Sequence, residues 1–194
     1  MKLVFATNNK NKLKEISMQL NDEFILQSLE DIGCEEEVPE TANTIEGNAT
    51  QKANYIFVKY GTPCFADDTG LEIEALNNAP GVYSARYAGP ERNDTNNINK
   101  VLLELDGQVN KKARFKTIIS LVIEEKEQLF EGIINGKIVS ERRGNNGFGY
   151  DPIFVPDGYS ETFAEMDPEL KNKISHRAIA FRKLIEHLNK TKLV

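Results

Sequence analysis

Two adjacent carboxylates, Asp67 and Asp68, follow an apolar segment at residues 63–66 that is predicted to form a short strand. Mg²⁺ in proteins takes one or two carboxylates and keeps several waters. Such a water is a potential nucleophile, and a carboxylate oxygen could orient or deprotonate it. Glu40 is a second acidic candidate, from a loop. The alternative is that Asp67 and Asp68 belong to an acidic turn, ending with Thr69 and Gly70, that binds no metal.

A polar segment between a predicted strand at residues 2–6 and a predicted helix at residues 10–20 is a candidate phosphate site. Its members are Thr7, Asn8, Asn9, Lys10, Asn11 and Lys12. Backbone N–H groups at a helix N-terminus bind anions, because the helix dipole lies behind them, and a lysine adds a positive charge. The segment is not a Walker loop, because the spacing G-x-x-x-x-G-K-[ST] is absent. The alternative is a capped turn that begins a helix with solvated lysines.

A glycine-rich segment at residues 144–149 is predicted to be a loop that leads into Tyr150 and Asp151. Aromatic side chains on such a loop, here Phe148 and Tyr150, can stack on a nucleobase. Asp151 could accept a hydrogen bond from a base N–H. Alternatively, the two aromatic side chains are core residues that anchor a loop.

Cationic side chains gather at two further places. Lys171, His176 and Arg177 lie at the start of the last predicted helix and could converge on a phosphate or a base carbonyl. Cations are unfavourable at a helix N-terminus, and a bound anion would resolve that conflict. Lys52 flanks the buried face of another predicted helix, where a lysine can also simply extend its charge to solvent.

The apolar periodicity predicts the elements that must position these groups. After the strand at 2–6 and the helix at 10–20, a second strand is predicted at 24–29. Two further helices are predicted, one from an N-cap at Thr44 to a stop at Gly61 and one over 93–105. An antiparallel pair of strands is predicted at 113–124 and 129–139. The predicted C-terminal helix has an apolar face made of Ile174, Ala178, Phe181, Ile185 and Leu188. Strands and helices intermix without strict alternation. This order favours an α/β fold with a mixed twisted sheet and flanking helices.

Length and composition limit the function classes. The 194 residues fit one domain, or two lobes sharing a core, and hydrophobic residues at 40% with charged residues at 28% are typical of a globular protein. The net charge of −6 argues against binding duplex nucleic acid. Cys34 and Cys64 are too few for a disulfide scaffold or a four-cysteine zinc site. The apolar runs at residues 3–6 and 118–123 are too short for a signal peptide core or a membrane span, so we expect a cytoplasmic protein without a membrane partner.

A phosphate loop, acidic residues suited to Mg²⁺, several cations and an aromatic loop together predict a metal-dependent hydrolase of a nucleotide. This prediction uses only the residue types and their spacing.

The sequence also resembles a known family, the inosine/xanthosine triphosphate pyrophosphatases. The resemblance lies in five motifs, in the family's order and over nearly the whole chain: Thr7-x-Asn9-x-x-Lys12, Phe65-Ala66-Asp67-Asp68-Thr69-Gly70-Leu71, Ala79-Pro80-Gly81-Val82-Tyr83-Ser84-Ala85-Arg86-Tyr87, Gly147-Phe148-Gly149-Tyr150-Asp151-Pro152 and Ser175-His176-Arg177. These enzymes cleave ITP, dITP and XTP to the monophosphate and pyrophosphate, which removes non-standard purines from the nucleotide pool. One departure is Asn8, where many relatives carry glycine.

The resemblance implies a single domain over residues 1–194 with two lobes around a central cleft, Mg²⁺ dependence and a homodimer. By position, it assigns phosphate binding to residues 7–12 with Lys52 beside them, and a substrate contact to Thr69. Glu40 and Asp68 would hold Mg²⁺, and Asp68 would be the base for water attack at the α-phosphorus. The purine would lie beside Phe148, Gly149 and Tyr150, with its edge recognised by Asp151, Lys171, His176 and Arg177.

Two other functions remain open from the sequence. A non-catalytic nucleotide sensor would use the same pocket to control a partner. A related pyrophosphatase would act on modified pyrimidine or standard nucleotides.

Overall fold

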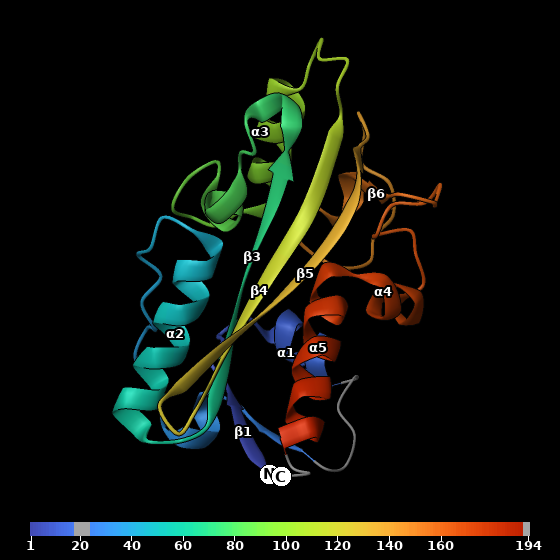
Figure 1. Ribbon diagram of the computed structural model, residues 1–194. Helices are drawn as coiled ribbons and strands as arrows, with labels where there is room; N and C mark the ends of the chain where they lie inside the picture. Colours follow the sequence, from blue (N-terminus) through green and yellow to red (C-terminus); the bar gives the residue numbers. More distant parts are fainter. Residues whose placement is uncertain (18–23, 192–194) are drawn as a thin grey trace. The chain divides into compact units, whose positions relative to one another are not determined.

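A computed structural model of the protein describes residues 1–17 and 24–191 (Figure 1). The helices are α1 (Lys10–Ser17), α2 (Ile45–Tyr60), α3 (Asp94–Glu104), α4 (Pro168–Ile174) and α5 (His176–Thr191). The strands are β1 (Lys2–Phe5), β2 (Ile25–Gln27), β3 (Cys64–Ile73), β4 (Lys112–Ile123), β5 (Lys126–Ile138) and β6 (Phe154–Pro156). The last three residues of the helix expected at 10–20 lie outside the described residues.

The strands form one mixed sheet in the order β2-β1-β3-β4-β5-β6. Strand β1 pairs in parallel with β2 and β3, whereas β5 and β6 are antiparallel. Strands β4 and β5 are neighbours joined by the two-residue turn Glu124-Glu125, whose φ angles of 50° and 63° suit a tight hairpin. The predicted α/β class with a mixed sheet is therefore confirmed.

The chain forms two compact units. The first unit comprises Met1–Asp68, Thr117–Gly132 and Arg177–Val194, and the second comprises Thr69–Lys116 and Ile133–His176. Strands β3, β4 and β5 each have residues in both units. The single domain expected over residues 1–194 stays a prediction.

In the first unit, helices cover both faces of the sheet (Figure 1). Alternate residues of β1 point to opposite faces, as strand geometry requires: Leu3 and Phe5 pack with α1 and α5, whereas Val4 pairs with α2 in a separate cluster. Helix α2 has the expected ends. The side chain of Thr44 accepts the Gly47 N–H at 2.9 Å, and Gly61 has a left-handed φ of 62°.

Strand β3 is much longer than predicted. It was expected to end before Asp67, but it continues to Ile73, so both aspartates lie within a strand and not in a turn. The alternative interpretation, an acidic turn that ends at Gly70, is therefore wrong. A strand can hold Asp67 and Asp68 here because each carboxylate has hydrogen-bond partners in the first unit, which are described below.

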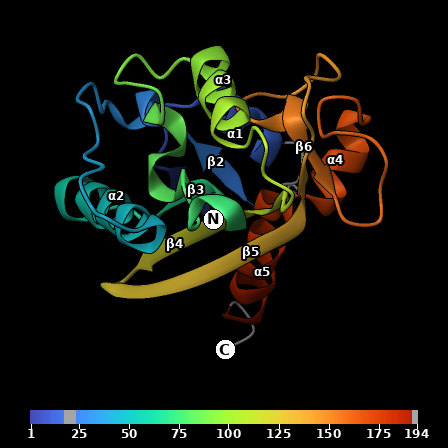
Figure 2. The ribbon, with the colours of Figure 1, turned by 90° about the horizontal axis from the view of Figure 1, so that it is seen from above.

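In the second unit, α3 packs its apolar face against β3 and β4 (Figure 2). Ile98, Val101 and Leu105 of the helix join a cluster that includes Leu71 and Phe115 from the strands. The three helix residues are spaced for one face of a helix, which is the signal that predicted this element at 93–105.

The expected C-terminal helix is divided in two. Helix α4 ends at Ile174, and α5 begins at His176 after the extended residue Ser175. Ile174 packs against the core of the second unit, whereas Phe181 and Leu188 belong to a core cluster of the first. The predicted apolar face therefore combined residues of two helices, because Ile174 happens to keep the helical spacing.

No helix in the described part of the chain is long and apolar enough to cross a lipid bilayer.

Candidate functional site

In the first unit, the carboxylate of Asp67 is buried between two cations. Its Oδ1 accepts a hydrogen bond from Lys12 Nζ at 2.9 Å, and its Oδ2 accepts one from Arg177 Nε at 3.3 Å. Arg177 also donates to the Glu15 carboxylate on α1. Burial by itself would raise the pKa of Asp67, but Lys12, Arg177 and Lys52 outweigh it and hold that pKa well below its usual range. Asp67 is therefore ionised and committed to these cations.

The polar segment before α1 contains a helix cap. Asn9 Oδ1 accepts hydrogen bonds from the backbone N–H groups of Asn11 at 3.0 Å and Lys12 at 3.3 Å, and Asn9 N–H donates to Thr7 Oγ1 at 3.2 Å. The cap thus uses two of the N–H groups that were expected to bind phosphate. Asn8, Lys10 and Asn11 are exposed, and Thr7 is buried.

Lys12 differs from the solvated lysine of the alternative interpretation. Its side chain is only 13% exposed and reaches Asp67. Burial lowers the pKa of Lys12, and the neighbouring carboxylate of Asp67 only partly offsets this. A partly exposed ammonium that is already held by a carboxylate is suited to binding an incoming phosphate oxygen.

Asp68 lies against α2. Its Oδ2 accepts a hydrogen bond from Asn48 Nδ2 at 3.2 Å, and its Oδ1 lies 3.7 Å from Lys52 Nζ. Burial raises the pKa of Asp68, and Lys52 and Lys12 oppose that rise without cancelling it. A carboxylate with a raised pKa is a better proton acceptor than an exposed one.

Lys52 joins the second acidic candidate to this group. Its buried ammonium donates to Glu40 Oε1 at 2.5 Å and to the Asp67 carbonyl oxygen at 2.7 Å. Burial favours the neutral amine, but Asp68, Glu40 and Asp67 outweigh it, and the pKa of Lys52 is raised. The structure therefore brings together Glu40, Asp68 and Lys52, three residues that the sequence singled out separately.

The donor set of Glu40 and Asp68 fits Mg²⁺. Each carboxylate has an oxygen near the same ammonium, Glu40 Oε1 at 2.5 Å and Asp68 Oδ1 at 3.7 Å from Lys52 Nζ, so the two lie in one neighbourhood. No group of three or more His, Cys, Asp or Glu side chains that could hold a metal occurs in residues 1–17 and 24–191. Two carboxylates with water and phosphate oxygens completing the shell are usual for Mg²⁺ and unusual for a structural metal held by protein alone.

In the second unit, Asp151 organises the glycine-rich loop. Its Oδ2 accepts hydrogen bonds from the Phe148 backbone N–H at 2.8 Å and from Lys171 Nζ at 2.7 Å. Gly147 has a φ of 77°, and a Cβ at this position would lie 2.0 Å from Asp151 Oδ2. The loop therefore needs glycine here both for its backbone angle and for the close approach of the carboxylate.

The two aromatic residues of the loop have different roles. Tyr150 is buried in the core, where its hydroxyl donates to the Ser84 carbonyl oxygen at 2.9 Å. Phe148 is half-buried, and Lys171 Nζ lies 5.2 Å from its ring centroid. The core interpretation thus describes the Tyr150 side chain, and Phe148 is the aromatic side chain with surface left for a base. Gly149 donates its N–H to Asp94 Oδ2 at 2.8 Å, which fastens the loop to α3.

The remaining predicted residues are placed as follows. His176 is buried and stacks on Phe115, with ring centroids 4.6 Å apart and planes 14° from parallel. Thr69 is half-buried on β3. Arg177 belongs to the first unit and His176 to the second, and the Arg177 guanidinium is bound by Asp67 and Glu15.

Sequence reasoning missed two residues of the first unit, Asn48 and Glu15. Asn48 precedes Lys52 by one helical turn, which places both on one face of α2. Glu15 follows Lys12 by three residues on α1, so the same rule applies. The spacing was therefore available in the sequence, but only the fold shows that these helix faces meet β3 and α5.

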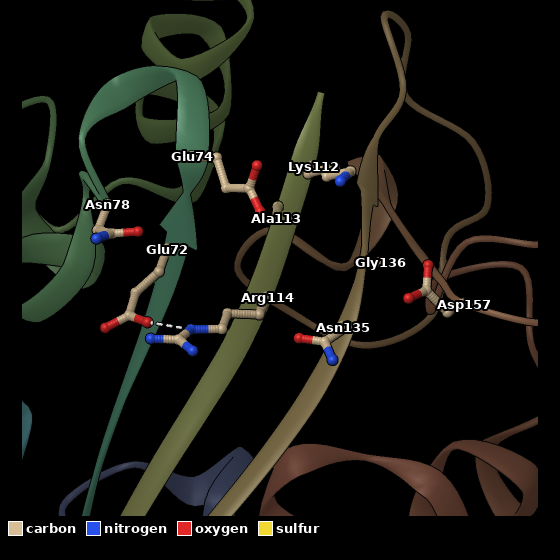
Figure 3. A pocket seen from close by; sticks show the side chains of 9 residues that line it. All are labelled: Glu72, Glu74, Asn78, Lys112, Ala113, Arg114, Asn135, Gly136 and Asp157. Atoms are coloured by element: carbon tan, nitrogen blue, oxygen red, sulfur yellow. Dashed lines mark hydrogen bonds and ion pairs between the residues drawn. The ribbon is translucent and has the colours of Figure 1, made fainter. Parts of the chain in front are cut away.

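A separate cavity of about 450 Å³ lies on the sheet of the second unit (Figure 3). Its lining is polar, and Arg114 Nε forms an ion pair with Glu72 Oε2 at 2.6 Å across two neighbouring strands. The lining residues are Glu72, Glu74, Asn78, Lys112, Ala113, Arg114, Asn135, Gly136 and Asp157. None of them is among the residues predicted to bind substrate or metal.

Comparison with known proteins agrees with the motifs. A dITP/XTP pyrophosphatase of Flavobacterium psychrophilum is 59% identical over 186 residues, covering 96% of this chain and 98% of that protein. The dITP/XTP pyrophosphatase of Porphyromonas gingivalis is 52% identical over 188 residues, covering 96% and 97%.

Solved structures show the same fold. A HAM1 protein from Coxiella burnetii matches with a TM-score of 0.91 and 39% identity, over 98% of this chain and 99% of that one. A nucleoside-triphosphatase/dITP/XTP pyrophosphatase from Mycobacterium abscessus matches with a TM-score of 0.78 and 42% identity, over 95% and 98%. The model of the Ham1 family matches residues 3–187, and the chain belongs to this family.

Proposed function

We propose that this protein is a Mg²⁺-dependent nucleoside-triphosphate pyrophosphatase that hydrolyses ITP, dITP and XTP to the monophosphate and pyrophosphate. The observation that carries the proposal is the position of Asp68, which is half-buried beside Lys52; the Lys52 ammonium also binds Glu40. Relatives that carry the name dITP/XTP pyrophosphatase at 52–59% identity support the substrate class.

In the proposed reaction, Asp68 accepts a proton from the attacking water. The water oxygen forms a bond to the α-phosphorus, and the bond from that phosphorus to the oxygen bridging to the β-phosphorus breaks. Pyrophosphate leaves with that oxygen.

Lys12 and Lys52 would neutralise the phosphate oxygens, on which negative charge is redistributed in the transition state. Lys52 is buried, the side chain of Lys12 is 13% exposed, and each ammonium is held by a carboxylate. Little reorganisation is then needed when the triphosphate binds. The exposed residues Asn8, Lys10 and Asn11 would contribute side-chain contacts from the same segment.

Glu40 and Asp68 would hold the Mg²⁺, which when bound polarises phosphate oxygens and lowers the pKa of a coordinated water. Lys52 Nζ donates to Glu40 Oε1 at 2.5 Å and lies 3.7 Å from Asp68 Oδ1. The lysine thus keeps the two carboxylates close to each other against their mutual repulsion.

Recognition of the purine is assigned to residues of the glycine-rich loop and its partners. Phe148 would stack on the base, while Gly149, Tyr150 and Asp151 fix the loop. Lys171, His176, Arg177 and the strand residue Thr69 are the other proposed substrate contacts, as the family motifs imply. We further propose a homodimer located in the cytoplasm.

The test is a Mg²⁺ assay of the purified protein with ITP, dITP, XTP, ATP and GTP, with products separated by ion exchange. Monophosphate and pyrophosphate from the first three, with ATP and GTP largely spared, would support the proposal. Diphosphate and free phosphate would move the attack to the γ-phosphorus and contradict the role of Asp68. Tight ITP binding without turnover would favour a nucleotide sensor, and faster turnover of pyrimidine or standard nucleotides would favour a related pyrophosphatase.

A further inference from the structure

Asn48 is a buried polar residue whose side chain connects two parts of the first unit. It is 1% exposed, and it lies on α2. Its Nδ2 donates to Asp68 Oδ2 at 3.2 Å, and its Oδ1 accepts the backbone N–H of Ala42 at 2.9 Å. Ala42 lies two residues after Glu40, so one amide links the strand that carries Asp68 to the segment that carries Glu40.

The orientation of this amide is fixed by its partners. A backbone N–H can only donate, so the amide oxygen must face Ala42 and the NH₂ group must face Asp68. Asp68 Oδ2 is then occupied by a donor, while Oδ1 remains on the side of Lys52. A carboxylate held in this way presents one oxygen in one direction.

We infer that Asn48 is a positioning residue for the hydrolysis, because it orients Asp68 and sets its distance from the Glu40 segment. This inference rests on the proposed function, in which Asp68 accepts the proton and shares the metal with Glu40. Asn48 acts through Asp68 and does not itself touch the reacting atoms.

Gln51 provides a matched control on the same helix. Its Oε1 accepts the Thr41 N–H at 2.8 Å, and its Nε2 donates to Thr41 Oγ1 at 2.8 Å. Gln51 therefore holds the same segment as Asn48 does, through Thr41, the residue before Ala42. Unlike Asn48, it makes no hydrogen bond to Asp68 through these two contacts. Comparing the two residues separates the fastening of the segment from the orientation of the carboxylate.

Three variants test the inference: Asn48→Ala, Asn48→Asp and Gln51→Ala. Asn48→Asp keeps an acceptor for the Ala42 N–H but replaces the amide donor to Asp68 with a carboxyl group that repels Asp68 when ionised, so it is informative even where Asn48→Ala folds poorly. We expect both Asn48 variants to lower kcat for dITP by about 10- to 100-fold, the size of a lost hydrogen bond to a charged group. KM should stay within about threefold of the wild type, because the phosphate-binding lysines are unchanged. Gln51→Ala should keep kcat within about threefold of the wild type.

Two outcomes would overturn the inference. Wild-type kcat in Asn48→Ala, or in both Asn48 variants, would show that the donor to Asp68 is dispensable. An equal loss in Gln51→Ala and Asn48→Ala would show that only the fastening of the segment matters.

A second measurement needs neither metal nor turnover. The side-chain amide signals of Asn48 in a ¹⁵N NMR spectrum should shift on Asp68→Asn, and they should stay in place on Gln51→Ala. Unchanged signals on Asp68→Asn would contradict the contact itself. If the wild type hydrolyses no nucleotide, the proposed function fails, and this spectrum still decides whether Asn48 contacts Asp68.

Discussion

Asp67 and Asp68 are neighbours in the sequence, but their side chains project from opposite faces of β3. Asp67 contacts Lys12 of α1 and Arg177 of α5, whereas Asp68 contacts Asn48 and Lys52 of α2. A strand alternates its side chains in this way with a period of two residues. The two carboxylates of the pair therefore have separate sets of partners: the carboxylate of Asp67 is bound by two cations, and that of Asp68 lies with the residues of α2.

The first prediction concerns activity. Asp68→Asn removes the proposed proton acceptor and keeps the shape of the side chain, so kcat for dITP should fall by about 10³-fold or more. Nucleotide binding, measured by calorimetry without metal, should change little because Lys12 and Lys52 remain. Full turnover in this variant would contradict the assignment of the base.

The second prediction concerns stability, and it separates the two aspartates. Asp67→Asn leaves the buried cations Lys12 and Arg177 without their shared carboxylate, which should lower the free energy of unfolding by about 3–5 kcal/mol. Asp68→Asn removes a carboxylate whose ionised form burial disfavours, so its stability should equal or exceed that of the wild type. Urea unfolding of both variants decides this, and equal losses would refute the division of roles.

The third prediction concerns pH. The folded-state pKa of Asp67 is depressed from the ordinary value of 3.8, so its ionisation stabilises the fold above that value, and the stabilisation is lost as the pH falls toward the lower folded-state pKa. The stability difference between the wild type and Asp67→Asn should therefore be constant near neutral pH and shrink below about pH 4. Urea titrations at several pH values measure it. A difference that does not change with acid would mean that the stabilisation does not come from the carboxylate charge.

The fourth prediction concerns Lys12, which is proposed to bind phosphate. Lys12→Ala should lower kcat/KM by about 10- to 100-fold, because a cation facing the phosphates stabilises the transition state more than the ground state. Lys14→Ala is the control, since Lys14 is an exposed lysine on the same helix. If the two variants were equally active, the general charge of the helix would explain binding and Lys12 would have no specific role.

The fifth prediction concerns the base. Phe148→Ala should weaken binding of ITP, XTP and GTP by a similar factor of about 10, because stacking on an aromatic ring does not depend on the groups at the base edge. Tyr159→Ala, which removes an aromatic ring that is 40% exposed in the same unit, should leave binding unchanged. Weaker binding of a single base would mean that Phe148 discriminates between bases.

The sequence by itself determined the local elements and the list of charged candidates. The helix from the Thr44 cap to Gly61, the strand at residues 2–6 and the β4–β5 hairpin follow from apolar periodicity and from capping or turn chemistry within a few residues. The same local patterns failed where the partners are distant. They ended β3 before Asp67 and merged α4 with α5.

Only the tertiary structure decided which charges meet. Whether an aspartate belongs in a strand depends on the cations that reach it, and here Arg177 lies 110 positions from Asp67 in the sequence. The division of work between Asp67 and Asp68, and the place of Asn48 beside Asp68, likewise depend on which helix covers each face of β3. Buried charges and amides are stable only with their partners in place. Those partners are brought together by the packing of apolar faces, and the local sequence around a residue does not specify which face will pack opposite it.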